Sequence, residues 1–181
     1  MTYDSRPETL EHIEKVRGYI ADVTRRLTIL ADEHDASKLV SPELEAFNKA
    51  TPLLQHLEYG TPEYKQSLKD LGPALEHHYE NNPHHPEYWI HGVRDMSLLY
   101  LIEMLCDWKA ASERMRKPTP AAEGRPPVPD YVDDDFVASI RLNKERFDFS
   151  DELCEILVQT ARELGFVSAS AGMTQWARQE D

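Results

Sequence analysis

The sequence predicts an all-α protein, and three observations support this prediction. Apolar residues recur every three or four positions along several segments, which is the period of an amphipathic helix. Glycine is scarce, with 7 residues, while the 12 prolines fall in clusters that would mark turns between helices. No segment shows the sustained alternation of apolar and polar residues that is typical of a strand. We therefore expect a single helical bundle of about six helices.

Three helices are expected in the first 80 residues. The clearest covers residues 7–31, where seven apolar side chains share one helical face: Leu10, Ile13, Val16, Ile20, Val23, Leu27 and Leu30. Ser41-Pro42-Glu43 combines a capping residue, a first-turn proline and an acid, which predicts a second helix up to residue 58. Thr61-Pro62-Glu63 repeats this pattern before a third helix that should end at residue 79 or 80.

The second half of the chain is expected to add three more helices. Pro83 and Pro86 exclude regular helix over residues 81–86. A long apolar-rich helix should then cover residues 87–116, and two further helices should cover residues 133–147 and 151–164.

Proline marks one internal boundary. Residues 117–129 (KPTPAAEGRPPVP) hold five prolines, which is typical of an exposed linker or loop. We therefore expect a helical core over residues 1–116, a linker over residues 117–130, and C-terminal helices within residues 131–181 that pack on the core. The tail from Ser168 onward is weakly patterned and should fray.

Charge and composition exclude several classes of function. Lys and Arg number 20 against 33 Asp and Glu, for a formal net charge of −13, whereas a general nucleic-acid binder needs a basic face. No apolar run approaches the roughly 20 residues of a membrane span, and no secretory signal is visible. Cys106 and Cys154 make no disulfide framework, so a reducing cytoplasm is expected. A homodimer is compatible with this composition.

Histidines and carboxylates suggest a metal site. His34 and Asp35 are adjacent at the break after the first helix, where a turn can aim both side chains at one ion. His12 lies near the start of that helix, and Asp107 lies in an apolar stretch where a carboxylate needs a partner. Two His-His pairs, His77-His78 and His84-His85, fall between them. Imidazole and carboxylate together suit Mn, Fe, Co, Ni or Zn better than Ca.

The order His12, His34-Asp35 and Asp107 on successive helices resembles the HD-domain superfamily of metal-dependent phosphohydrolases. The segment His34-Asp35-Ala36-Ser37-Lys38 is similar to the His-Asp-x-Gly-Lys signature of the HD-GYP phosphodiesterases, with serine in place of glycine; the Gly-Tyr-Pro element is absent. The later histidines, followed by Glu87, resemble the extra ligands of bimetallic members. The segment from Asn82 to Trp89 is also similar to a small uncharacterised family of bacterial and phage proteins.

The resemblance implies a metal site and a role for each residue in it. One divalent transition metal would be held by four residues: His12, His34, Asp35 and Asp107. Asp35 would bridge to a second ion held by His78, His84 or His85, and within the two pairs we favour His78 and His85. Lys38 lies one helical turn from the His-Asp pair and could neutralise a phosphate oxygen.

The resemblance also implies a reaction. The protein would hydrolyse a nucleotide or another small phosphate ester through a metal-bound hydroxide, with Asp35 and Lys38 as its catalytic residues. Two alternatives stay open: an HD-fold di-iron oxygenase with much the same ligands, and a non-catalytic helical interaction module that a metal stabilises. Glu103, one turn before Asp107, is either a hydrogen-bond acceptor for a ligand or a plain exposed carboxylate.

Overall fold

The computed structural model describes residues 3–54, 57, 61–114 and 134–167, and all regular elements in these residues are helical, with no strands. The all-α prediction is therefore confirmed. Seven α-helices are present in these residues: α1 (Arg6–Glu33), α2 (Glu43–Leu54), α3 (Pro62–Leu71), α4 (Pro73–Asn81), α5 (Leu98–Arg114), α6 (Asp134–Phe147) and α7 (Asp151–Glu163). Three short 3₁₀ turns accompany them: η1 (Ala36–Leu39), η2 (Pro86–Tyr88) and η3 (Gly92–Asp95).

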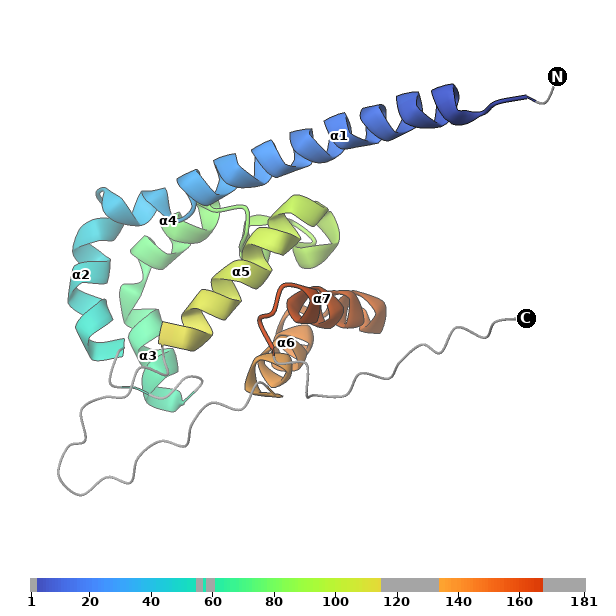
Figure 1. Ribbon diagram of the computed structural model, residues 1–181. Helices are drawn as coiled ribbons and strands as arrows, with labels where there is room; N and C mark the ends of the chain where they lie inside the picture. The colour runs from blue at the N-terminus through green and yellow to red at the C-terminus, as the bar shows by residue number, and fades with distance from the viewer. Residues whose placement is uncertain (1–2, 55–56, 58–60, 115–133, 168–181) are drawn as a thin grey trace.

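Helix α5 lies at the centre of the molecule. Figure 1 shows α2, α3 and α4 on one side of α5 and the pair α6 and α7 on the other. The apolar core joins α5 to this pair, and its most deeply buried members are Met104, Leu105, Phe136, Ile140, Val158 and Ala161. Helix α7 begins at a true N-cap, because the Ser150 side chain accepts a hydrogen bond from the backbone N–H of Leu153.

Helix α1 is a long rod that extends away from the rest of the molecule (Figure 1). Only its C-terminal end packs against the domain, on α5, and there Leu30 is buried. All side chains from Tyr3 to Arg26 are exposed. The predicted helix is thus present, but most of its apolar face does not reach the core of this chain.

Two predicted helices are interrupted in the structure. The helix expected to end at residue 79 or 80 divides into α3 and α4 at Gly72-Pro73, where Gly72 adopts a φ of +44° and Pro73 has no N–H for a helical hydrogen bond. The helix expected from residue 87 begins only at Leu98. Gly92, with a φ of +60°, breaks the preceding segment into η2 and η3.

Some predictions fall outside the described residues. The expected linker over residues 117–130 and the expected tail from Ser168 both lie there. In the part that the structure describes, no helix is both long enough and apolar enough to cross a membrane. Both cysteines are free; Cys106 is exposed and Cys154 is buried.

Candidate metal centre

The turn after α1 presents His34 and Asp35 together. Helix α1 ends at Glu33, and Asp35 adopts a left-handed conformation with a φ of +56°, which an aspartate tolerates better than most residues. Within a continuing helix the two neighbouring side chains would point about 100° apart. The turn instead places His34 Nε2 3.7 Å from Asp35 Oδ2.

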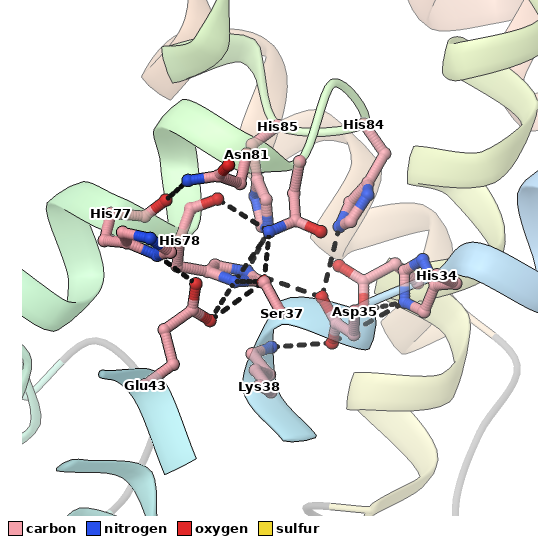
Figure 2. Close-up of polar contacts among 12 residues, drawn as sticks. His34, Asp35, Ser37, Lys38, Glu43, His77, His78, Asn81, His84 and His85 are labelled. Carbon is pink, nitrogen blue, oxygen red and sulfur yellow. Dashed lines mark hydrogen bonds and ion pairs between the residues drawn. The ribbon is translucent and has the colours of Figure 1, made fainter. Parts of the chain in front are cut away.

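Helix α4 and the turn that follows it bring three histidines to Asp35 (Figure 2). His78 Nε2 lies 3.4 Å from Asp35 Oδ1 and 2.9 Å from His85 Nε2, and His84 Nε2 lies 3.6 Å from Asp35 Oδ1. One ligand atom from each of these four residues lies within 4.8 Å of the others. Two atoms that bind one ion at about 2.1 Å are at most about 4.2 Å apart, so a small adjustment of side chains closes this group around a cation.

A second group is built on α5. Glu103 Oε1 lies 3.0 Å from His34 Nδ1 and 3.1 Å from His84 Nδ1. Asp107, one turn further along α5, places its Oδ1 3.8 Å from His34 Nε2. The same His84 therefore belongs to both groups, and the two groups are continuous.

Glu43 sets the protonation pattern of His78. The Glu43 carboxylate is completely buried and accepts hydrogen bonds from His77 Nδ1 at 2.7 Å and from His78 Nδ1 at 2.9 Å. Burial works to raise the pKa of Glu43, but the hydrogen bonds from His77 and Ser37 outweigh it and lower that pKa. The carboxylate is therefore ionised, His78 donates from Nδ1, and its Nε2 carries the lone pair, which faces His85 Nε2 at 2.9 Å.

The amide of Asn82 is consistent with this pattern. Its nitrogen donates to the backbone carbonyl of His78 at 2.7 Å and to Ser37 Oγ at 2.8 Å, which uses both amide hydrogens. The amide nitrogen also lies 3.0 Å from His78 Nδ1, but it has no hydrogen left for that atom, so His78 Nδ1 can donate its own proton to Glu43.

Glu103 has the same effect on two other histidines. Its carboxylate accepts hydrogen bonds from the Nδ1 atoms of His34 and His84. The Nε2 atom of each imidazole therefore faces Asp35. Burial raises the pKa of Glu103, but the hydrogen bonds from His34 and His84 prevail and lower it to about 2. A carboxylate behind the far nitrogen of a histidine is the usual support of a metal-binding imidazole.

Two of the atoms that face one another in this centre are acceptors without a donor. Among the described residues, Asp35 Oδ1 and His84 Nε2 are buried and have no hydrogen-bond partner. Buried polar atoms normally have a hydrogen-bond partner, and each of these two unsatisfied atoms lowers the stability of the fold. A divalent cation would satisfy both atoms together with the lone pair of His78, so the residues present fit a metal ion.

The charges of the centre also favour a cation. Four carboxylates, those of Asp35, Glu43, Glu103 and Asp107, outnumber the ammonium of Lys38. Burial and the nearby charges of His84 and His78 lower the pKa of His85 to about 3, so His85 is neutral. Hydrogen bonds to Asp107 and Glu103 raise the pKa of His34 to about 10, so a proton occupies this imidazole until a metal displaces it.

Lys38 lies at the solvent side of the centre. Its Nζ donates to Asp35 Oδ2 at 2.7 Å and lies 5.2 Å from the centre of the Phe47 ring. Burial raises the pKa of Asp35, but the charge of Lys38 and its hydrogen bond prevail and lower it. Lys38 thus contacts the carboxylate on which His78 and His84 converge, one turn after the His-Asp pair as the spacing predicts.

The structure brings together five of the six metal ligands expected from sequence. These are His34, Asp35, His78, His85 and Asp107, and the preferred His78 is buried while His77 is partly exposed and bonds to Glu43. His12 is the exception, and its inclusion needs correction. It is exposed and lies 22 positions before His34 in the same helix, about 33 Å away at 1.5 Å per residue.

Other residues of the centre were not expected or were left open. His84 is 2 % exposed and contacts both Asp35 and Glu103. The preference for His85 over His84 as a metal ligand therefore omits a residue at the centre of the cluster. Glu103 is the hydrogen-bond acceptor rather than an exposed carboxylate; its spacing of four from Asp107 was the available signal. The sequence places Glu43 at a helix start and Asn82 in a turn. Nothing in their local sequence distinguishes these roles from supporting a metal ligand.

Comparison with known proteins places the chain in a family. A model described as a family of unknown function (DUF5662) matches residues 1–163, and the chain belongs to this family. No curated protein matches the chain, and no solved structure does.

Proposed function

We propose that this protein is a metal-dependent phosphohydrolase that acts on a nucleotide or another small phosphate ester. The observation that supports it most is the convergence of His78 Nε2 and His84 Nε2 on Asp35 Oδ1. The opposite nitrogen of each imidazole is held by a carboxylate, that of Glu43 for His78 and that of Glu103 for His84. The order of these residues along the chain agrees with the resemblance to HD-domain phosphohydrolases, apart from His12.

The two groups offer places for two ions. One would use the Oδ1 side of Asp35 with His78, His84 and His85, and the other would use the Oδ2 side with His34 and Asp107. When bound, a pair of divalent cations polarises a phosphoryl group and lowers the pKa of a water molecule toward neutrality. Asp35 would belong to both places, as the resemblance implies.

The exposure of the side chains gives the centre an open edge. His78 and His84 are 2 % exposed, whereas the side chains of Asp35, Asp107 and Lys38 are 24 %, 27 % and 32 % exposed. A substrate would therefore approach from the edge that holds Lys38. A purely structural metal site has a closed set of protein ligands, so this open edge favours a catalytic or binding role over the structural module.

Lys38 would have two partners in turn. Without a cation its ammonium neutralises Asp35. If Asp35 held a cation, the Lys38 ammonium would be available to a phosphate oxygen at the open edge, where it would stabilise the charge of the transition state. The Phe47 ring, whose centre lies 5.2 Å from Lys38 Nζ, would help to hold the ammonium at this edge.

The test compares Lys38→Met with the wild type. Lys49→Met, an exposed lysine of α2, is the matched control. Hydrolysis of a generic phosphodiester and of a nucleoside monophosphate panel is measured with Mn²⁺, and metal content is measured on the same samples. We expect Lys38→Met to keep its metal and lose about 10²-fold or more in turnover, while Lys49→Met keeps both. A fully active Lys38→Met would remove Lys38 from the reaction.

The same samples separate the alternatives. A di-iron oxygenase would show a mixed-valence iron signal and consume oxygen with its substrate while leaving phosphate esters intact. A structural module would bind metal and show no turnover with any tested ester, and Lys38→Met would then change stability by at most about 0.5 kcal/mol.

A further inference from the structure

The exposed part of α1 has an apolar face that its own domain does not cover. We call residues 6–26 of α1 the arm; all its side chains are exposed, and it extends away from the domain (Figure 1). Ile20 is 60 % exposed and Val23 is 48 % exposed, on the same face as Ile13 and Val16. Amphipathic helices gain most of their stability from packing of the apolar face, so this face needs a partner.

The spacing of the apolar residues specifies the kind of partner. Ile13, Ile20 and Leu27 are seven positions apart, and so are Val16, Val23 and Leu30. Together they occupy the a and d positions of three consecutive heptads, which is the pattern of a helix that packs against another helix. The seam runs without a polar interruption from the arm to the end of α1.

The remaining positions of the arm behave as the outside of a coiled coil. Three ion pairs link them along the helix: Lys15 with Glu11 at 2.6 Å, Arg17 with Glu14 at 3.5 Å, and Arg25 with Asp22 at 3.0 Å. Alternating charges that pair within one helix are typical of a solvated coiled-coil surface. A helix that lies on a membrane has instead a mainly basic polar face and aromatic anchors.

We propose that the arm pairs with the arm of a second copy of this chain in an antiparallel two-helix coiled coil. An identical partner presents the same heptads over the same length, about 30 Å. The antiparallel orientation follows from the domain, because α5 covers the seam near Leu30. In a parallel pair, the domain of each copy would occupy the space of the other helix, whereas an antiparallel pair places each domain beyond the end of the partner's arm.

The area of the seam determines how strong this pairing can be. An aliphatic side chain removes about 60 to 120 Å² of apolar surface from water when it is buried. The five aliphatic residues of the arm are Leu10, Ile13, Val16, Ile20 and Val23, and two copies would bury about 600 to 1,200 Å². Specific interfaces bury about 1,000 Å² or more, so we expect a dimer that dissociates on dilution.

The test is sedimentation equilibrium of the full chain from low micromolar to a few hundred micromolar concentration. Ile20→Glu places a charge in the seam, and its neighbour Ala21→Glu places the same charge on the outer face as a matched control. We expect dimers for the wild type and Ala21→Glu, and monomers for Ile20→Glu. Metal content should be equal in all three, because both residues are exposed and lie in the arm, away from the metal centre.

Four results would overturn the proposal. They are a wild type that stays monomeric throughout, an Ile20→Glu variant that still dimerises, loss of the dimer in Ala21→Glu, and a trimer or tetramer in place of the dimer. A monomeric wild type that binds phosphatidylserine vesicles would assign the seam to a membrane surface instead. None of these outcomes depends on the proposed hydrolase activity.

Discussion

Replacing Glu43 by glutamine tests the metal centre through a residue that would not touch the ion. The carboxylate accepts from three donors: His77 on one oxygen, and His78 and Ser37 on the other. Glutamine has the same shape but offers one oxygen and one NH₂ group. If the oxygen stays with His77, the NH₂ group meets the N–H of His78.

This conflict would alter the imidazole itself. His78 can relieve it by moving its proton from Nδ1 to Nε2, which turns the proposed ligand atom into a donor. Loss of such a supporting hydrogen bond costs about 10- to 100-fold in metal affinity, or about 1.4 to 2.7 kcal/mol. If His78 keeps its tautomer, one buried donor is left unsatisfied, and the free energy of unfolding falls by about 1 to 3 kcal/mol.

The assay is a chelator-competition titration with Zn²⁺ and with Mn²⁺, together with thermal unfolding of the metal-free chain. Glu45→Gln is the control, because Glu45 is an exposed carboxylate two positions along the same helix. We expect weaker binding or lower stability in Glu43→Gln alone. Wild-type affinity and wild-type stability in that variant would refute the role of Glu43.

Three further predictions concern the ligands and their protons. His34→Ala and Asp35→Ala should each lose bound metal and unfold at a lower temperature than the loaded wild type, whereas His12→Ala should match the wild type in metal analysis and in a melting curve. His85→Ala should lower the metal stoichiometry, measured by mass spectrometry, without emptying the centre; a wild type that never binds more than one ion would leave a single-metal site. The raised pKa of His34 stabilises the metal-free chain fully below about pH 6.5, and this stabilisation should be lost as the pH rises toward about 10; a melting temperature of the metal-free chain that stays level over that range would contradict the assignment.

The sequence predicts the parts of this protein that depend on local patterns. The helix period of α6 and α7 locates both to within one residue, and the adjacent His34-Asp35 pair at a helix break indicates the centre of the candidate metal site. His12 shows the limit of such patterns. Its position on an apolar-patterned helix is the same whether that helix packs on its own domain or leaves it, and only the tertiary structure distinguishes the two cases.

Glu43 shows a second limit, because a glutamate at this position is explained equally well by a favourable helix start and by a role in supporting a metal ligand. An acid in the first turn of a helix is favourable next to the helix dipole, and Glu43 satisfies that rule at the start of α2. The rule gives no reason for the side chain to be fully buried. Its burial depends on α4, whose histidines are more than 30 positions away in the sequence.

The distribution of buried residues indicates that the candidate metal centre contributes to the stability of the fold as well as to any chemistry. The large apolar cluster is built around α5, α6 and α7. Within α2–α4, the buried apolar side chains among the described residues are Leu71 and Ala74. The buried polar groups are Glu43 and His78 in these helices, and Asn82 and His84 just after α4. The polar cluster therefore takes the place of an apolar core between α4 and α5. Such clusters stabilise a fold only when every member is satisfied, and here Asp35 Oδ1 and His84 Nε2 are the members that a cation would complete.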